Sequence, residues 1–99
     1  MKKTTPHSHV VEAMSLQELC RFCRADETWI LELVDYGVLS PEGASVTEWH
    51  FRGTNIARAK KAQRLNRDLG INTAGIALIL DLLAERAAIL RQLSRHQER

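Results

Sequence analysis

The stretch Ala25–Pro41 has the sequence A-D-E-T-W-I-L-E-L-V-D-Y-G-V-L-S-P. It predicts the second helix of a helix-turn-helix, because Asp26 is a favoured helix N-cap and Gly37 a favoured C-terminal stop. In a DNA-binding protein this helix enters the major groove. Here it carries acidic residues and no Lys or Arg, whereas duplex DNA presents one negative charge per about 1.7 Å of its axis. This segment therefore has the shape of a DNA-binding element, but its negative charge favours a protein partner.

Charge is distributed unevenly over the 99 residues. Residues 1–50 contain four Lys or Arg and eight Asp or Glu, a net charge of −4, and residues 51–99 contain ten against four, a net charge of +6. Any affinity for nucleic acid must therefore come from the second half. No apolar run approaches the about 20 residues that a membrane span needs, and no apolar segment follows the basic N-terminus. We expect a cytoplasmic protein of one domain, without membrane contact.

The flanking segments predict a mostly α, winged helix-turn-helix fold. Ser15-Leu16-Gln17-Glu18 is a capping box, which starts a first helix that ends near Cys23. Strand propensity at residues 10–14 and 46–51 predicts two strands that pair as a small wing. Residues 1–9 are polar and lack periodicity, so we expect a disordered tail there.

Two further helices are expected in the second half. Thr54 is predicted to cap a basic helix over residues 55–69 that ends at Gly70, and Thr73 to cap a helix that extends to about Arg95. At 1.5 Å per residue this last helix is roughly 33 Å long, more than so small a domain can cover.

The long helix carries apolar residues on more than one face, which predicts a homodimer. The expected dimerisation residues have a/d spacing and are Ile76, Ile79, Leu83, Leu90 and Leu93. The alternative is a helix that folds back entirely on its own domain.

The two cysteines form a C-x-x-C pair, Cys20 and Cys23. Zinc or redox chemistry is one interpretation, but the four histidines show no ligand spacing near the pair. Since Leu16 and Leu19 share its helical stripe, burial in the core is the favoured interpretation. There is also no glycine-rich phosphate loop and no nucleophile–base motif, so we expect no metal, no cofactor and no enzymatic activity.

Several motifs together resemble the CbpM-type chaperone modulators, which share the ancestry of the MerR-type regulators. They are L-Q-E-L-C at Leu16–Cys20, the segment Asp26–Pro41, T-x-W-x-F at Thr47–Phe51, and A-x-R-L-x-x-D-L-G-I-N-x-x-G-I-A-L within Ala62–Leu82. The resemblance covers roughly residues 10–93. It implies a MerR-like winged domain over residues 10–72, a dimerisation helix over 73–95 and a frayed end over 96–99.

The resemblance implies a small dimeric inhibitor that binds the J-domain of a DnaJ-type (CbpA) co-chaperone and blocks its work with the DnaK chaperone. J-domains resemble one another in having a basic helix that meets an acidic face of DnaK, so an acidic helix suits an inhibitor. The predicted partner-binding residues lie on the outer side of the second helix and are Thr28, Leu31, Glu32, Asp35 and Tyr36. Alternatively, Leu31 and Tyr36 cover the wing, and Glu32 and Asp35 form a solvated face.

DNA binding is the rival function. The third helix carries five cations, which are Arg58, Lys60, Lys61, Arg64 and Arg67. In a winged architecture this helix contacts only phosphates, so we expect weak and non-specific DNA binding or none.

Overall fold

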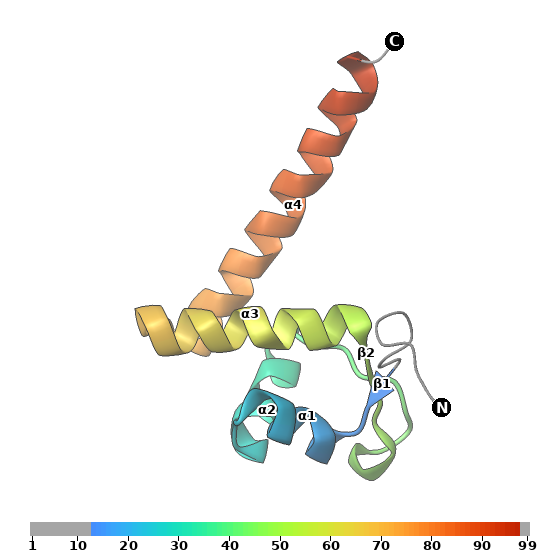
Figure 1. Ribbon diagram of the computed structural model, residues 1–99, viewed down its shortest axis with the longest axis vertical. Helices are drawn as coiled ribbons and strands as arrows, with labels where there is room; N and C mark the ends of the chain where they lie inside the picture. Colours follow the sequence, from blue (N-terminus) through green and yellow to red (C-terminus); the bar gives the residue numbers. More distant parts are fainter. Residues whose placement is uncertain (1–12, 98–99) are drawn as a thin grey trace, which may run out of the picture.

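Four helices and a two-stranded antiparallel sheet make up residues 13–97, the part of the chain that this computed structural model describes (Figure 1). The elements are β1 (Ala13–Met14), α1 (Leu16–Cys23), α2 (Glu27–Asp35), the 3-10 turn η1 (Val46–Glu48), β2 (Phe51–Arg52), α3 (Gly53–Leu69) and α4 (Thr73–Gln97). The predicted, mostly helical winged fold is confirmed. The tail expected over residues 1–9 lies outside the described residues.

The helix-turn-helix forms where its capping residues predict it. The Ser15 hydroxyl accepts a hydrogen bond from the Glu18 backbone N–H at 3.1 Å, and the Glu18 carboxylate accepts one from the Ser15 N–H at 2.9 Å. Arg24 ends α1 in the left-handed conformation, with φ +54°. Asp26 occupies the N-cap position of α2 but makes no side-chain capping bond, and Gly37 follows α2 with φ +78°.

The wing is shorter than predicted. Ala13 pairs with Arg52 and Met14 with Phe51, so the expected pairing of the two segments is confirmed. The strand expected over residues 46–51 is wrong for residues 46–48, which form η1, and is confirmed at Phe51 of β2, while a single bridge joins Glu42 to His50. The 3-10 turn forms in place of a strand because the Glu48 N–H donates a hydrogen bond to the Ser45 carbonyl at 2.8 Å, which bends the chain out of extended geometry.

The third helix begins at Gly53, one residue before Thr54, which was its predicted N-cap. Arg52 stands at the N-cap position and makes no side-chain capping bond, so Thr54 lies inside α3 and does not cap it. The C-terminal stop is confirmed, because Gly70 adopts φ +68°. The buried residues of α3 are two alanines, Ala59 and Ala62.

The fourth helix is capped by Asn72 and not by Thr73. The Asn72 side-chain oxygen accepts a hydrogen bond from the Gly75 N–H at 2.9 Å. Thr73 is buried, so its side chain belongs to the core. The helix continues to Gln97, about 37 Å in all. The helix thus includes residues 96–97, which were expected in a frayed end, and residues 98–99 lie outside the described part.

The core lies between α3 and the helix-turn-helix, with the first turns of α4 closing one side. Its buried apolar residues are Leu16, Leu19, Cys23, Ile30, Leu33, Val38, Leu39, Phe51, Ala59, Ala62, Ile76 and Leu80. Beyond Leu80 every described residue of α4 is exposed, and the helix projects away from the domain (Figure 1).

The wing turn depends on Gly43, which gives a test of the local fold. Gly43 has φ +129°, and a Cβ there would lie 2.5 Å from the Glu48 carbonyl oxygen. Gly43→Ala should therefore lower the free energy of unfolding by about 1–3 kcal/mol. Gly53→Ala is the matched control, because its Cβ meets nothing within 4 Å, and it should be neutral or stabilise the helix by up to about 1 kcal/mol. Equal urea midpoints for the two variants would contradict this account of the turn.

Candidate protein-binding surfaces

The second helix of the helix-turn-helix has one buried and one exposed side. Ile30 and Leu33 are fully buried and Val34 is half-buried against the core, in line with the predicted inward face. The exposed side carries four of the five predicted partner-binding residues, namely Thr28, Glu32, Asp35 and Tyr36. We call these four residues the acidic surface. It presents a half-exposed aromatic ring beside two carboxylates, a combination that protein interfaces use for anchoring and steering.

The carboxylates of the acidic surface are not neutralised within residues 13–97. The ion pairs of this part of the chain join Arg52 to Glu42, Arg58 to Asp81 and Arg67 to Asp68. Glu32 and Asp35 make none, so both charges remain available to a partner.

Leu31, the fifth predicted partner-binding residue, differs from the others. It is half-buried and packs against the core, so much of its side chain is used inside the domain. It lies at the edge of the acidic surface and offers a smaller anchor than Tyr36, which is 51% exposed.

On the wing, Glu42 is paired within the domain, whereas Glu48 is exposed and makes no ion pair among residues 13–97. Glu42 is held by the Arg52 guanidinium at 3.0 Å, with both side chains exposed. Phe51 is fully buried, and Trp49 packs edge-on against it with ring centroids 5.9 Å apart. Phe51 thus belongs to the core, and Trp49 packs against it.

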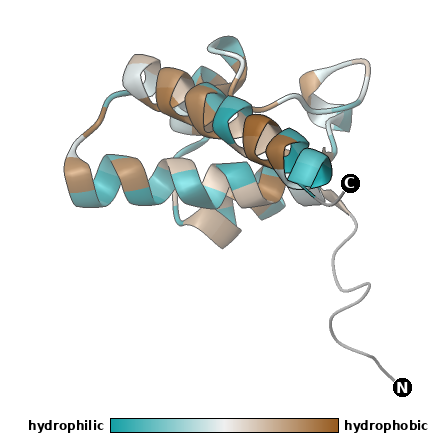
Figure 2. Ribbon diagram, turned by 90° about the horizontal axis from the view of Figure 1, so that it is seen from above, coloured by the Kyte–Doolittle hydropathy of each residue, from teal (hydrophilic) through white to brown (hydrophobic). Residues whose placement is uncertain are grey.

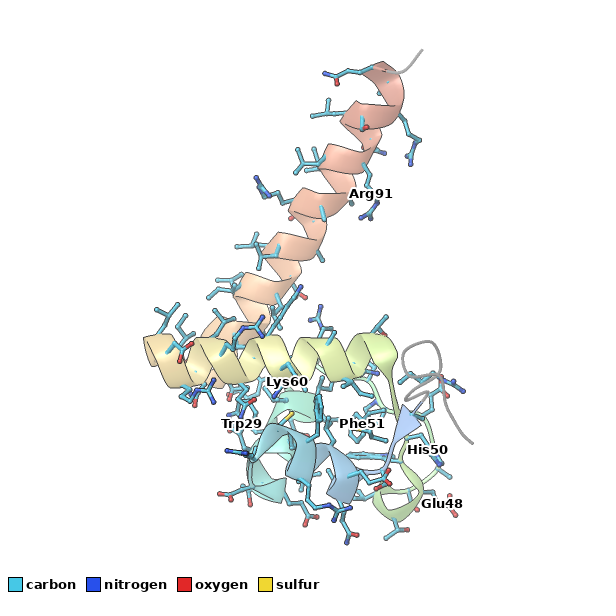
Figure 3. All side chains as sticks on the ribbon, viewed as in Figure 1. Trp29, Glu48, His50, Phe51, Lys60 and Arg91 are labelled. Carbon is cyan, nitrogen blue, oxygen red and sulfur yellow. The ribbon has the colours of Figure 1, made fainter. Side chains whose placement is uncertain are left out.

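The five cations of α3 lie in two settings: Lys61, Arg64 and Arg67 are exposed, and Arg58 and Lys60 are half-buried. Arg58 donates a hydrogen bond to the Val38 carbonyl at 2.8 Å and lies 3.7 Å from Asp81 of α4. Lys60 points the other way, toward α1, where its ammonium lies 4.7 Å from the centre of the Phe22 ring (Figure 3). Both side chains are therefore engaged inside the protein, which weakens the case for a phosphate-binding stripe.

The outer part of α4 carries a stripe of exposed apolar side chains, and apolar positions recur along its ribbon (Figure 2). Its large members are Leu78, Leu82, Leu83, Ile89, Leu90 and Leu93. We call this set the apolar stripe. Three predicted dimerisation residues, Leu83, Leu90 and Leu93, belong to it. Leu78, Leu82 and Ile89 are exposed beside them, because the helix exposes a wider face than a heptad spacing selects.

Two predicted dimerisation residues are not on the apolar stripe. Ile76 is fully buried in the core of its own domain, so its assignment to a dimer seam is wrong. The cause is that the first two turns of α4 cover α3 before the helix leaves the domain. Ile79 is half-buried at the border of the two regions.

The cysteine pair lies in and beside the core. Cys23 is fully buried and Cys20 half-buried, and both are free thiols. Burial raises the pKa of Cys20, and the nearby Glu27 and Asp26 raise it further. Burial also raises the pKa of Cys23, against a smaller opposing effect of Lys60. Residues 13–97 contain no group of three or more His, Cys, Asp or Glu placed to hold a metal ion.

Known proteins resemble this chain over most of its length. A family described as MerR HTH family regulatory protein matches residues 14–97. The chaperone modulatory protein CbpM of Coxiella burnetii is 40% identical over 70 residues, which are 71% of this chain and 66% of that protein. The chain thus spans just under two thirds of the Coxiella relative. The CbpM of Pseudomonas entomophila is 30% identical over 78 residues, 79% of this chain and 77% of that protein.

The chain belongs to the CbpM family, within the MerR-type helix-turn-helix proteins. Both family names describe regulators or modulators and not catalysts. None of the helices described for this CbpM-family chain has the length and apolar character needed to cross a membrane.

The raised thiol pKa values lead to a prediction about reactivity. At neutral pH a raised pKa leaves less thiolate, which is the reactive form. In a Cys20→Ser variant, Cys23 should react with iodoacetamide about a hundredfold more slowly in the native protein than in guanidinium, because the buried thiol reacts only when the structure opens. Mass spectrometry of timed samples measures both rates. A native rate close to the unfolded one would show that Cys23 is not part of a stable core.

Proposed function

We propose that this protein modulates a chaperone system by binding the J-domain of a CbpA- or DnaJ-type co-chaperone through the acidic surface of α2. The single observation that carries the proposal is the sign of the charge on the helix that would otherwise meet DNA. Glu32 and Asp35 are exposed and make no ion pair among the described residues. Membership of the CbpM family supports the same conclusion.

The chemistry of the acidic surface fits a basic helix as its ligand. Two carboxylates one turn apart attract a row of Lys or Arg, and they raise the association rate. The Tyr36 ring supplies apolar contact area next to them, as interface anchors do. A J-domain whose basic helix is covered in this way cannot present that helix to DnaK. Inhibition is thus competition for one positively charged surface.

Charge reversal on α2 tests the proposal. Glu32→Lys and Asp35→Lys should each reduce the rate of association with an isolated J-domain, by about tenfold for the pair at low salt, because attraction becomes repulsion. Added salt should shrink the difference. Surface plasmon resonance measures the rate, and the control is Glu85→Lys, which makes the same charge change at an exposed position of α4.

The side chain of Tyr36 allows an independent measurement of the same surface. Tyr36→Ala should weaken the binding free energy by about 1–2 kcal/mol, through faster dissociation, if the ring is an anchor. Circular dichroism must show each variant folded. Folded charge-reversal variants that bind the J-domain as tightly as the unchanged protein would place the interface elsewhere.

We further propose that the protein is a homodimer joined along the apolar stripe of α4. The six large side chains of the stripe are 47–60% exposed, and an unpartnered apolar face of this length favours association. The geometry leaves the acidic surface free, because the outer part of α4 extends away from α1 and α2 (Figure 1).

A single charge in the apolar stripe tests the dimer. Leu90 lies far beyond the domain core, so Leu90→Asp should leave the fold intact and shift the protein to monomers, because an unpaired carboxylate in the seam is costly. Ala88→Asp introduces the same group on another face of α4 and should leave the dimer intact. Sedimentation at micromolar concentration distinguishes the two. A monomeric unchanged protein would refute the proposal.

DNA binding is the less favoured function. The acidic surface occupies the position of base contacts, and Arg58 and Lys60 are engaged inside the domain. Any remaining affinity would come from phosphate contacts of α3 and would fall steeply with salt.

A further inference from the structure

A notch separates the α1–α2 turn from α3 on the side of the domain next to the acidic surface. Its volume is about 370 Å³, enough for one or two side chains, and its lining includes Arg24, Asp26, Trp29, Gln63, Asn66 and Arg67. Neither the core nor the acidic surface accounts for this grouping of two guanidinium groups beside an indole ring.

The amides in the notch are already used within the protein. Gln63 donates a hydrogen bond to the Cys23 carbonyl, and Asn66 donates one to the Ile71 carbonyl at 3.0 Å. These bonds hold the α3 wall in place. The remaining strong donors of the notch are the guanidinium groups of Arg24 and Arg67.

Both guanidinium groups have capacity for a ligand. Arg24 has no carboxylate within 4.0 Å among residues 13–97, and Arg67 contacts only its neighbour Asp68, at 3.4 Å with both side chains well exposed. Such an exposed pair is weak and is easily exchanged for a better-placed anion.

The net charge of the notch determines which kind of anion can bind there. Two arginines and Asp26 leave a net charge of +1, since 2 − 1 = 1. One carboxylate neutralises it. A nucleic acid strand would bring several phosphates past Asp26 and Glu27 and be repelled. The geometry therefore favours one acidic side chain of a protein, with its apolar part against Trp29.

The notch and the acidic surface are continuous along α2. Trp29, Glu32 and Tyr36 stand at helical positions i, i+3 and i+7 and so share one stripe. We propose, on the basis of the proposed function, that the notch receives a carboxylate of the same J-domain whose basic helix lies on the acidic surface. The guanidinium groups of the notch and the carboxylates of the acidic surface then fix the direction in which the J-domain binds.

The Arg24→Gly variant tests the contribution of Arg24 to binding without destabilising the fold. Arg24 has φ +54° and ψ +49°, a conformation that glycine adopts at lower cost than arginine. The substitution should therefore keep or raise the melting temperature while it removes one guanidinium group. Arg67→Gln removes the other, and Arg91→Gln on the projecting part of α4 (Figure 3) is the control with the same charge change.

The experiment measures Kd for the isolated J-domain by isothermal titration calorimetry. Arg24→Gly and Arg67→Gln should each weaken binding about threefold to fivefold at low salt, and Arg91→Gln should not. Among J-domain variants with single Asp→Asn or Glu→Gln changes, one should show the same loss, with no further loss when combined with Arg24→Gly. Unchanged affinity of both arginine variants, or no coupled J-domain residue, would overturn the inference.

The two proposals fail in different ways. If the unchanged protein does not bind the J-domain, the proposed function is wrong. If it binds and the Glu32→Lys and Asp35→Lys changes abolish binding while both arginine variants bind normally, the acidic surface stands and only the notch is refuted.

Discussion

Close packing against α3 is the constraint on which this domain depends, because α1, β2 and α4 all contact that helix. The approach is possible because α3 buries methyl groups, Ala59 and Ala62, where larger side chains would hold its neighbours apart. Specific polar bonds then fix the neighbours. Gln63 holds the end of α1 through the Cys23 carbonyl, and Arg58 holds the loop after α2 through Val38. With α3 as the central support, α2 is exposed along its outer side.

The packing around α3 also keeps the acidic residues of α2 apart from the basic residues of α3. The acidic residues of α2 point to solvent on the outer side, while two cations of α3, Lys60 and Arg58, are engaged toward α1 and α4. If the two sets had met, they would have neutralised one another at the surface, and neither would attract a partner from a distance. Separation by the core leaves an acidic surface with a small positive notch at its end, which is a directional surface and not a uniformly charged one.

The sequence predicted those features that depend on local rules. The capping box at Ser15, the glycine stops at Gly37 and Gly70 and the inward face of α2 all follow from spacing and backbone preference. The length of the wing strand and the assignment of Ile76 to a dimer seam were wrong. A turn competes with a short strand, and tertiary packing decides which part of an amphipathic helix is covered. The notch had no sequence signal, since Arg24 and Arg67 lie far apart in the chain and meet only through the α1–α3 contact.

The position of α4 separates the proposed dimer surface from the proposed partner surface. Its first turns close the core through Ile76 and Leu80, so the helix leaves the domain in a fixed direction. The apolar stripe begins at Leu78, where coverage by α3 ends, and runs outward, away from α2 (Figure 1). The proposed dimer would therefore be joined along a segment that is separate from the acidic surface, and its two-fold symmetry would give it two equivalent sites for basic helices.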